Sequence, residues 1–339
     1  MENNPEIAYV TWSSGSETLP IAVIDVTDPS FALEDTAASR ATLDASFLEE
    51  ERRQSRKPRF IMNLMLRAGA RQSRLLHSLV HPSADYFDGL TTYIVKLGPD
   101  HLPPGFNTAL DRKVVSTPHV TSIRVRLQQC AYLMADRLTG ILESLPATPL
   151  HLFNVAGGTA IDSLNALIVL SERRPELLQR PIRIFVMDID TIGPSFGALA
   201  TAALKQEGHA LSGIDVQLLH EAYDWNDARP LGLKIEQSRK QEAIVAVSAE
   251  GGLFEYGNDQ AVVANLKAMT GNGSAATVVV GSVTRSGAAR KASMQRANFK
   301  LYPRTMEQFD SLARQAGFEA TRVEESPISY QVLLERVTR

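Results

Sequence analysis

The sequence predicts an α/β protein with a doubly wound, mixed seven-stranded sheet, and three observations support this prediction. From residue 146 onward, short apolar runs alternate with helical segments, which is typical of a sheet covered on both faces. Pro146 and Pro149 interrupt the helical pattern that precedes this region. The last two apolar runs are joined by about four residues, too few for a parallel crossover. We therefore expect the final strand pair to be antiparallel.

Each predicted strand is a short apolar run between turn or helix signals. Helical patterns separate the first five runs, which favours parallel order. The expected strands are 150–155, 182–187, 216–220, 243–247, 275–280, 318–323 and 328–336, and the expected helices are 161–174, 195–207, 260–270 and 305–316.

Residues 1–145 are predicted to form a mostly helical region next to a second domain, 146–339. The clearest helix covers 120–145, where apolar residues recur at intervals of three and four and form one stripe. Such a region suits a cap that shields a site from water, and a dimerisation module is the alternative. Two short strands at 7–12 and 20–26, a charged helix at 36–57, and helices at 58–69, 71–80 and 84–96 are also expected.

Composition excludes several classes of protein. The 339 residues carry a net charge of −3, which argues against a nucleic-acid binder attracted by bulk positive charge. The single cysteine, Cys130, leaves no disulfide framework or Cys-rich zinc site, and the histidines show no metal-ligand spacing, so no metal is expected. No apolar run approaches the ~20 residues of a membrane helix, and no signal-peptide pattern is present. We expect a cytoplasmic protein without a membrane partner.

The residues that directly follow the predicted strands are the candidates for ligand binding, because open α/β sheets bind ligands beyond the carboxyl ends of their strands. Small residues after the first strand allow a ligand to approach the backbone, and a carboxylate after the second can accept both hydroxyls of a ribose. In chain order these candidates are Asn154, Ala156, Gly157, Gly158, Asp188, Asp190, Asp224, Trp225, Ser248, Ala249 and Glu250.

With these residues in this order, the region 146–339 resembles the class I S-adenosylmethionine-dependent methyltransferases. The resemblance implies a Rossmann-like methyltransferase sheet and S-adenosylmethionine as the cofactor. The segments that carry it are 153–160 (FNVAGGTA), 185–190 (FVMDID), 247–253 (VSAEGGL) and 306–318 (MEQFDSLARQAGF).

The resemblance also implies roles for individual residues. In that family the turn after the first strand packs against the methionine part of the cofactor, here Ala156 to Gly158. The acid after the second strand holds the ribose, here Asp188, and an acid after the third strand often meets the adenine amine, here Asp224. The chain departs from the family at Asn154, where an acid is usual, and at two alanines, 156 and 160, where glycine is usual. Alanine suits these positions if its φ is negative.

Methyl transfer from a sulfonium is a direct displacement with a neutral leaving group, so the protein mainly aligns the nucleophile and, where needed, removes its proton. Glu250 and His220 are the candidate catalytic bases, with a helix cap and a structural histidine as the alternatives. Tyr256 is a candidate substrate contact. Tyr93 either lines a substrate pocket or packs in the core, and the core is favoured.

The segment 282–304 holds six basic residues and no acid. We expect Arg285 and Arg290 in this segment to recognise an anionic group of the substrate, and a solvated basic loop is the alternative.

The sequence thus predicts an S-adenosylmethionine-dependent methyltransferase that acts on a small molecule, with secondary metabolism as the expected setting. Two alternatives remain open: a non-methylating enzyme of this fold, catalysing a cyclisation or elimination, and a non-catalytic binding relic. The sequence leaves open whether the protein forms a homodimer. The motifs of nicotinamide dehydrogenases, P-loop proteins and α/β-hydrolases are absent.

Overall fold

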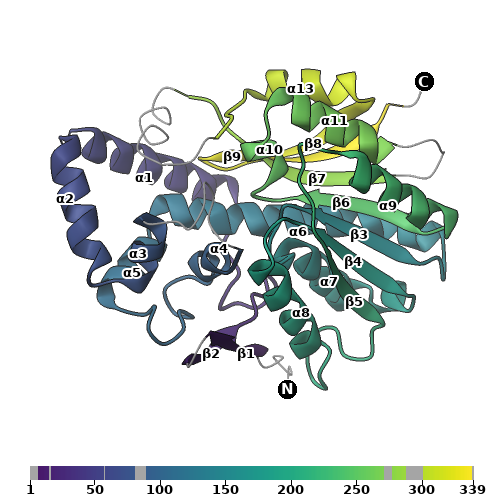
Figure 1. Cartoon of the computed structure of the whole chain (residues 1–339), viewed down its shortest axis with the longest axis horizontal. Coiled ribbons are helices and arrows are strands. Elements are labelled where there is room, and N and C mark those ends of the chain that lie inside the picture. Colours follow the sequence, from purple (N-terminus) through teal and green to yellow (C-terminus); the bar gives the residue numbers. More distant parts are fainter. Residues whose placement is uncertain are drawn as a thin grey trace.

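The computed structural model describes residues 7–14, 17–56, 58–80, 89–270, 277–287 and 301–337. Within them, seven strands form one mixed sheet in the order β5-β4-β3-β6-β7-β9-β8 (Figure 1). The first five strands are parallel and β9 runs antiparallel to β8, as the sequence predicts; β9 also runs antiparallel to β7. The strands are β3 (Leu150–Val155), β4 (Ile182–Met187), β5 (Val216–Glu221), β6 (Ile244–Ala249), β7 (Thr277–Thr284), β8 (Phe318–Glu325) and β9 (Ser329–Arg336).

Helices cover both faces of the sheet, because alternate side chains of its central strands belong to two separate apolar clusters. In β3, for example, Leu152 faces one cluster and Phe153 the other. The first cluster includes side chains of α7 (Ile161–Arg173) and α8 (Ile192–Leu204). The second includes side chains of α9 (Arg229–Lys240), α10 (Leu253–Tyr256), α11 (Asp259–Thr270) and α13 (Met306–Gln315). A short 3-10 helix, η1 (Pro175–Leu178), follows α7.

Helix α9 is missing from the sequence-based expectation, and its composition explains why. Its twelve residues, RPLGLKIEQSRK, are mostly polar, and the buried ones are Leu231, Ile235 and Ser238. Two apolar anchors four residues apart are too few to produce a recognisable helical stripe.

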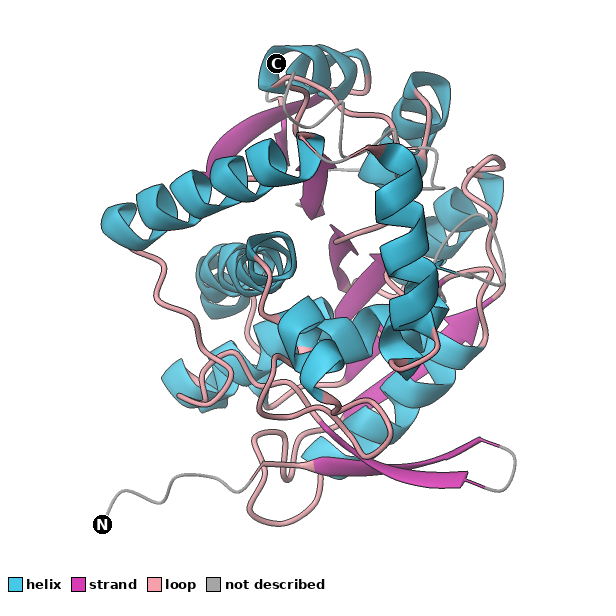
Figure 2. Ribbon diagram, turned by 90° about the vertical axis from the view of Figure 1, so that its left-hand side faces the viewer, coloured by secondary structure: helices cyan, strands magenta, loops and turns pink. Residues whose placement is uncertain are grey.

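The N-terminal region is mostly helical, as expected, and begins with an antiparallel hairpin of β1 (Tyr9–Ser14) and β2 (Glu17–Ala22). The expected strands, 7–12 and 20–26, lie two to four residues farther from the turn than β1 and β2 do. In Figure 2 the hairpin lies at the bottom, at one end of the molecule. The helices are α1 (Ala37–Ser55), α2 (Arg59–Ala70), α3 (Arg74–Val80), α4 (Gly89–Lys96), α5 (Ala109–Val115) and α6 (Pro118–Ser144).

Helix α6 packs on the sheet domain although it precedes residue 145. Its apolar stripe, including Leu127 and Leu138, belongs to the same cluster as Leu152 of β3 and Leu164 of α7. Cys130 is buried in this stripe, as expected for a small apolar residue. The core is therefore continuous across the division at residue 145, and that division stays a prediction.

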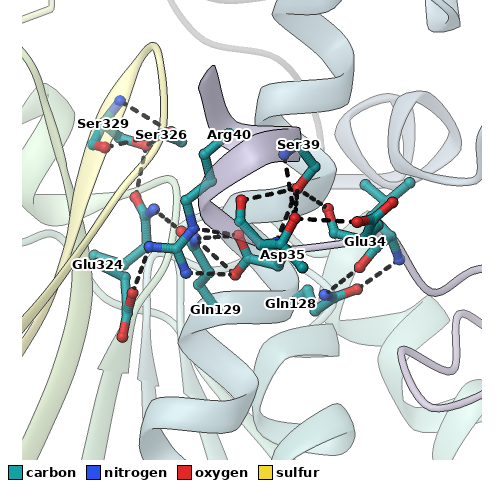
Figure 3. A network of polar contacts seen from close by, with 12 residues as sticks. Glu34, Asp35, Ser39, Arg40, Gln128, Gln129, Glu324, Ser326 and Ser329 are labelled. Carbon is teal, nitrogen blue, oxygen red and sulfur yellow. Dashed lines mark hydrogen bonds and ion pairs between the residues drawn. The ribbon is translucent and has the colours of Figure 1, made fainter. Parts of the chain in front are cut away.

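A polar network fixes the start of α1 to α6 and to the β8–β9 hairpin (Figure 3). Arg40 donates to both oxygens of Asp35, at 2.5 and 2.9 Å, and to Glu324 Oε2 at 2.8 Å. Gln129 of α6 donates from Nε2 to the same Asp35 oxygens, at 2.9 and 3.1 Å. Gln331 of β9 donates to Gln129 Oε1. Arg40 and Gln129 thereby share the Asp35 carboxylate, and the β8–β9 hairpin joins the network through Glu324 and Gln331.

Tyr93 of α4 is the buried anchor between that helix and the N-terminal segment. Its hydroxyl donates to the carbonyl of Ala22 at 2.7 Å and accepts from the amide of Ile24 at 2.8 Å. Its ring packs on Phe196 with centroids 4.5 Å apart. The core placement favoured by the sequence is confirmed.

We expect Tyr93→Phe to lower the free energy of unfolding by about 2–4 kcal/mol, since it leaves two buried backbone groups without partners. Urea denaturation measures this loss. The matched control is Tyr9→Phe, because Tyr9 is 55% exposed, and that change should be close to neutral. Equal losses in the two variants would show that the Tyr93 hydroxyl contributes nothing.

Candidate functional site

The residues that follow β3, β4 and β6 meet at one edge of the sheet, as expected for neighbouring parallel strands. Asn154 of β3 lies opposite Val186 of β4 on one side and Ser248 of β6 on the other. The carboxyl edge therefore brings together the candidate residues at the ends of β3, β4 and β6.

The turn after β3 has the left-handed backbone of a glycine turn, although two of its residues are alanines. φ is 54° at Ala156, 58° at Gly158 and 53° at Ala160. The condition under which alanine would suit these positions, a negative φ, is therefore not met. A left-handed alanine costs roughly 1–2 kcal/mol, so surrounding contacts must hold this shape; Ala156 donates its amide to the carbonyl of Met187 at 2.9 Å. Gly157 lies against Asn154, where a Cβ would be 2.1 Å from Oδ1.

Asp188, the expected ribose ligand, lies at the end of β4 with 8% of its surface exposed. Its Oδ2 accepts from the amide of Gly158 and its Oδ1 from the amide of Asp190, both at 2.9 Å. Burial raises the pKa of this carboxyl. The acid and the turn are therefore adjacent, and backbone amides already bind both carboxylate oxygens.

Asp190 connects this turn to the N-terminal region. Its Oδ2 accepts from the amide of Gly193 in α8 at 2.9 Å and from the amide of Gly89 in α4 at 3.0 Å. Gly89 packs closely against two other glycines: a Cβ built on it would lie 2.7 Å from Gly193 Cα and 3.2 Å from Gly158 Cα. Three backbone segments thus meet where the sequence predicts the ribose.

Of the remaining candidates, Asp224 and Trp225 follow β5 and His220 lies within it. Asp224 is exposed and accepts from the amide and the side chain of Asn226, at 2.9 and 2.8 Å. Trp225 is partly buried against the α9–α11 face, and its carbonyl accepts from Asn265 at 2.8 Å. His220 is exposed, and its Nε2 lies 2.9 Å from the carbonyl oxygen of Asp188, a contact that suits a structural histidine.

A buried polar cluster lies between the ends of β3 and β6. Asn154 donates from Nδ2 to Asp162 Oδ1 at 2.7 Å and to Ser248 Oγ at 2.9 Å, and Ser248 also donates to Asp162 Oδ2. Burial and the charge of Glu250 raise the pKa of Asp162 to about 6. Asp162 was not among the candidates; its sequence signal is an acid in the first turn of the helix after the small-residue turn.

A second buried cluster surrounds Glu250. Its Oε2 accepts from Lys96 of α4 and its Oε1 from Arg126 of α6, both at 2.5 Å. Arg126 also binds Glu255 Oε1 at 2.7 Å, and Ser282 donates to the same oxygen at 3.1 Å. Burial raises the pKa of Glu250, but the charges of Arg126 and Lys96 outweigh it and lower the pKa to about 2.

This pairing bears on the role expected of Glu250. A carboxylate with so low a pKa, held by two cations, is a poor proton acceptor at neutral pH. Both carboxylate oxygens of Glu250 are engaged in these ion pairs, so the side chain does not act as the helix cap considered as its alternative role. Lys96, Arg126 and Glu255 were missed by the sequence reasoning, since nothing local marks cations from two distant helices as partners of one carboxylate.

The remaining candidates lie around these clusters. Ala249 is fully buried at the end of β6, and Tyr256 is half-buried; burial and the charge of Glu255 raise the pKa of Tyr256. Arg285 donates to the carbonyl of Ser326 at 2.9 Å, lies 3.4 Å from Glu325 Oε2 and stacks over the Tyr330 ring. Its cation is already paired within the protein. Arg290 lies outside the described residues.

Three further observations limit the kind of site. Among the described residues, no three His, Cys, Asp or Glu side chains are grouped to hold a metal ion. In the same residues, no helix combines the length and apolarity needed to span a bilayer. Two shallow surface depressions, one lined by Thr270 and Arg336 and the other by Lys267 and Leu312, include none of the candidate residues.

Comparison with known proteins supports the fold. No protein-family model and no curated protein sequence matches the chain. A structure from Bordetella parapertussis, described as a possible exported protein, is 15% identical over 90% of this chain and 100% of that chain, with a TM-score of 0.55. Magnesium protoporphyrin IX methyltransferase from Synechocystis, solved with bound S-adenosylhomocysteine, is 12% identical over 65% and 87% of the two chains, with a TM-score of 0.43. The pyocyanin biosynthetic protein PhzM is 13% identical over 67% and 58%, with a TM-score of 0.38.

At these identities the similarity concerns fold alone. The described sheet is mixed, has seven strands and carries helices on both faces, and the predicted fold class is confirmed. The first of these structures also covers the N-terminal region.

We expect Arg126→Met to lower the free energy of unfolding by about 3–5 kcal/mol, because it removes one cation from two buried carboxylates. Chemical denaturation at neutral pH measures the effect. Arg53→Met is the control, since Arg53 pairs with Glu49 on the surface, with side chains 71% and 66% exposed; its loss should be below about 1 kcal/mol. A similarly small loss in Arg126→Met would contradict a structural role for the cluster.

The raised pKa of Asp162 predicts a pH effect on stability. The folded value of about 6 exceeds the unfolded value of about 3.9, so the native state binds more protons between them and stability from this group falls as pH rises from 4 to 6. Asp162→Asn should flatten that part of the stability–pH curve, measured by denaturation at several pH values. The exposed Asp215→Asn change should leave the curve as in wild type, and an unchanged slope in Asp162→Asn would refute the assignment.

Proposed function

We propose that the protein binds S-adenosylmethionine at the carboxyl edge between β3 and β4 and transfers its methyl group to a small molecule. The observation that carries the proposal is the contact between Asp188 and the turn after β3, where the carboxylate lies 2.9 Å from the amide of Gly158. A carboxylate at a strand end, next to a small-residue turn that opens a helix, is an arrangement suited to a nucleoside.

The residues present fit the cofactor in type and order. Asp188 would hold the ribose hydroxyls, and the small residues from Ala156 to Gly158 would let the methionine part approach the backbone. When bound, the cofactor supplies an electrophilic methyl group. Beside the adjoining strand ends, the side chains of Asn154, Asp162 and Ser248 are already hydrogen-bonded to one another.

The N-terminal region favours a small acceptor. Helices α4 and α6 reach over the end of β6, where Lys96 and Arg126 are both about 5% exposed. A site covered in this way excludes water and admits a small molecule more readily than a macromolecule. We accordingly propose that residues 1–145 act as the cap.

The non-catalytic relic remains the second candidate, and one observation favours it. Both oxygens of Asp188 and both oxygens of Asp190 already accept from backbone amides, and Gly89 packs on the turn. A protein of this fold that no longer binds a cofactor would need neither free carboxylate oxygens nor space for a ligand at this edge.

Calorimetric titration with S-adenosylhomocysteine separates the candidates. Wild type should bind it, and Asp188→Ala should weaken binding by about 1.5–3 kcal/mol, as expected for lost hydrogen bonds to a charged acceptor. Asp215→Ala, directly before β5 and therefore at the opposite edge of the sheet, is the matched control and should bind as wild type does. Circular dichroism checks that each variant is folded.

Failure of folded wild type to bind would favour the relic. If Asp188→Ala binds S-adenosylhomocysteine as tightly as wild type does, Asp188 does not hold the ribose. Once binding is established, mass spectrometry of candidate acceptors tests whether a methyl group is transferred or another reaction occurs.

A further inference from the structure

Helix α4 lies at the end of the sheet that faces the N-terminal helices (Figure 1), and it contacts two separate parts of the carboxyl edge. Its first residue, Gly89, contacts the turn after β3, and its last, Lys96, binds Glu250 beyond β6. An eight-residue helix is about 12 Å long, so one short element bridges both groups of candidate residues. Tyr93 anchors its middle to Ala22 and Ile24.

The contact at Gly89 is one that only glycines allow. Besides the short distances from a Cβ on Gly89, a Cβ on Gly158 would lie 3.0 Å from Gly89 Cα, and one on Gly193 would lie 2.9 Å from Gly158 Cα. Contacts this close leave no room for another molecule between the three backbones. The amide of Gly89 also occupies Asp190 Oδ2 at 3.0 Å.

The two ends of α4 differ in how firmly they are held. In the first turn Gly89, Leu90 and Thr92 are partly exposed and Thr91 is buried, whereas all residues from Tyr93 to Lys96 are buried. The last turn carries the Tyr93 anchor and the buried Lys96–Glu250 pair. The first turn is therefore the part of the helix that moves at the lower cost, since it buries less surface.

We propose that the first turn of α4 is a built-in competitor for the ribose end of the cofactor site. Cofactor binding then requires Gly89 to withdraw from between Gly158 and Gly193, while the last turn stays anchored through Tyr93 and Lys96. This inference rests on the proposed function. Its consequence is that the apparent affinity is reduced by the fraction of molecules in which the first turn is withdrawn.

The test compares the binding of S-adenosylhomocysteine to wild type and to Gly89→Ala. The added methyl group cannot fit 2.7 Å from Gly193 Cα, so it disfavours the conformation in which residue 89 packs between Gly158 and Gly193. We expect the dissociation constant to fall about 5- to 50-fold, as more molecules become competent to bind. Gly140→Ala is the matched control, because a Cβ at Gly140 in α6 meets nothing within 4 Å; its dissociation constant should equal that of wild type.

The outcomes separate this inference from the proposed function. Equal or weaker binding by Gly89→Ala, with wild type binding, overturns the competitor and leaves the cofactor site intact. Absence of binding by wild type and both variants overturns the proposed function, and the competitor with it. Tighter binding by Gly89→Ala alone supports the inference.

Hydrogen exchange of the wild-type protein gives a readout that needs no variant. On addition of S-adenosylhomocysteine, amides in the first turn of α4 should exchange faster, because the turn leaves its position between Gly158 and Gly193. A cap that simply closes over a bound ligand would slow the same amides, and slower or unchanged exchange under saturating ligand overturns the inference.

Discussion

The arrangement of the carboxyl edge depends on the buried pairing of Glu250 with Lys96 and Arg126. An unpaired charge at this depth would cost several kcal/mol, so the carboxylate after β6 requires a cation from α4 and another from α6. This requirement draws both helices over the edge of the sheet. Once Lys96 is in place and Tyr93 is anchored, the direction of α4 brings Gly89 to the turn after β3. The covered edge is thus a consequence of charge neutralisation as much as of apolar packing.

The same pairing changes what the acids at this edge can do. Glu250 is held ionised by its cations, whereas burial and the charge of Glu250 raise the pKa of Asp162 to about 6. Asp188 and Asp190 accept from backbone amides. Acids that look alike in the sequence therefore divide into an ion-pair partner, a proton-binding group and loop anchors, according to which neighbours the fold supplies.

The parts of the fold that the sequence predicted correctly are those with local signals. The strands Leu150–Val155 and Ile182–Met187 are mostly apolar, and each is buried at almost every position. Helix α9 was missed because it has only two apolar anchors, Leu231 and Ile235. The left-handed φ of Ala156 has no local signal in the sequence, because alanine does not prefer it and the contact that accompanies it, from the Ala156 amide to the Met187 carbonyl, comes from the neighbouring strand.

The sequence by itself determined the alternation of strands and helices, the antiparallel final pair and the set of polar residues after each strand, because these follow from periodicity and chain order. Only the tertiary structure decided which of those polar residues are already bound. Lys96, Arg126 and Glu250 are separated by 30 residues or more along the chain, and Gly89 is as remote from Gly158. Contacts between such distant positions arise from packing of whole elements, for which no local pattern exists. The physical reason is that burial, which sets both the pairing of charges and the room left for a ligand, is a property of the folded chain.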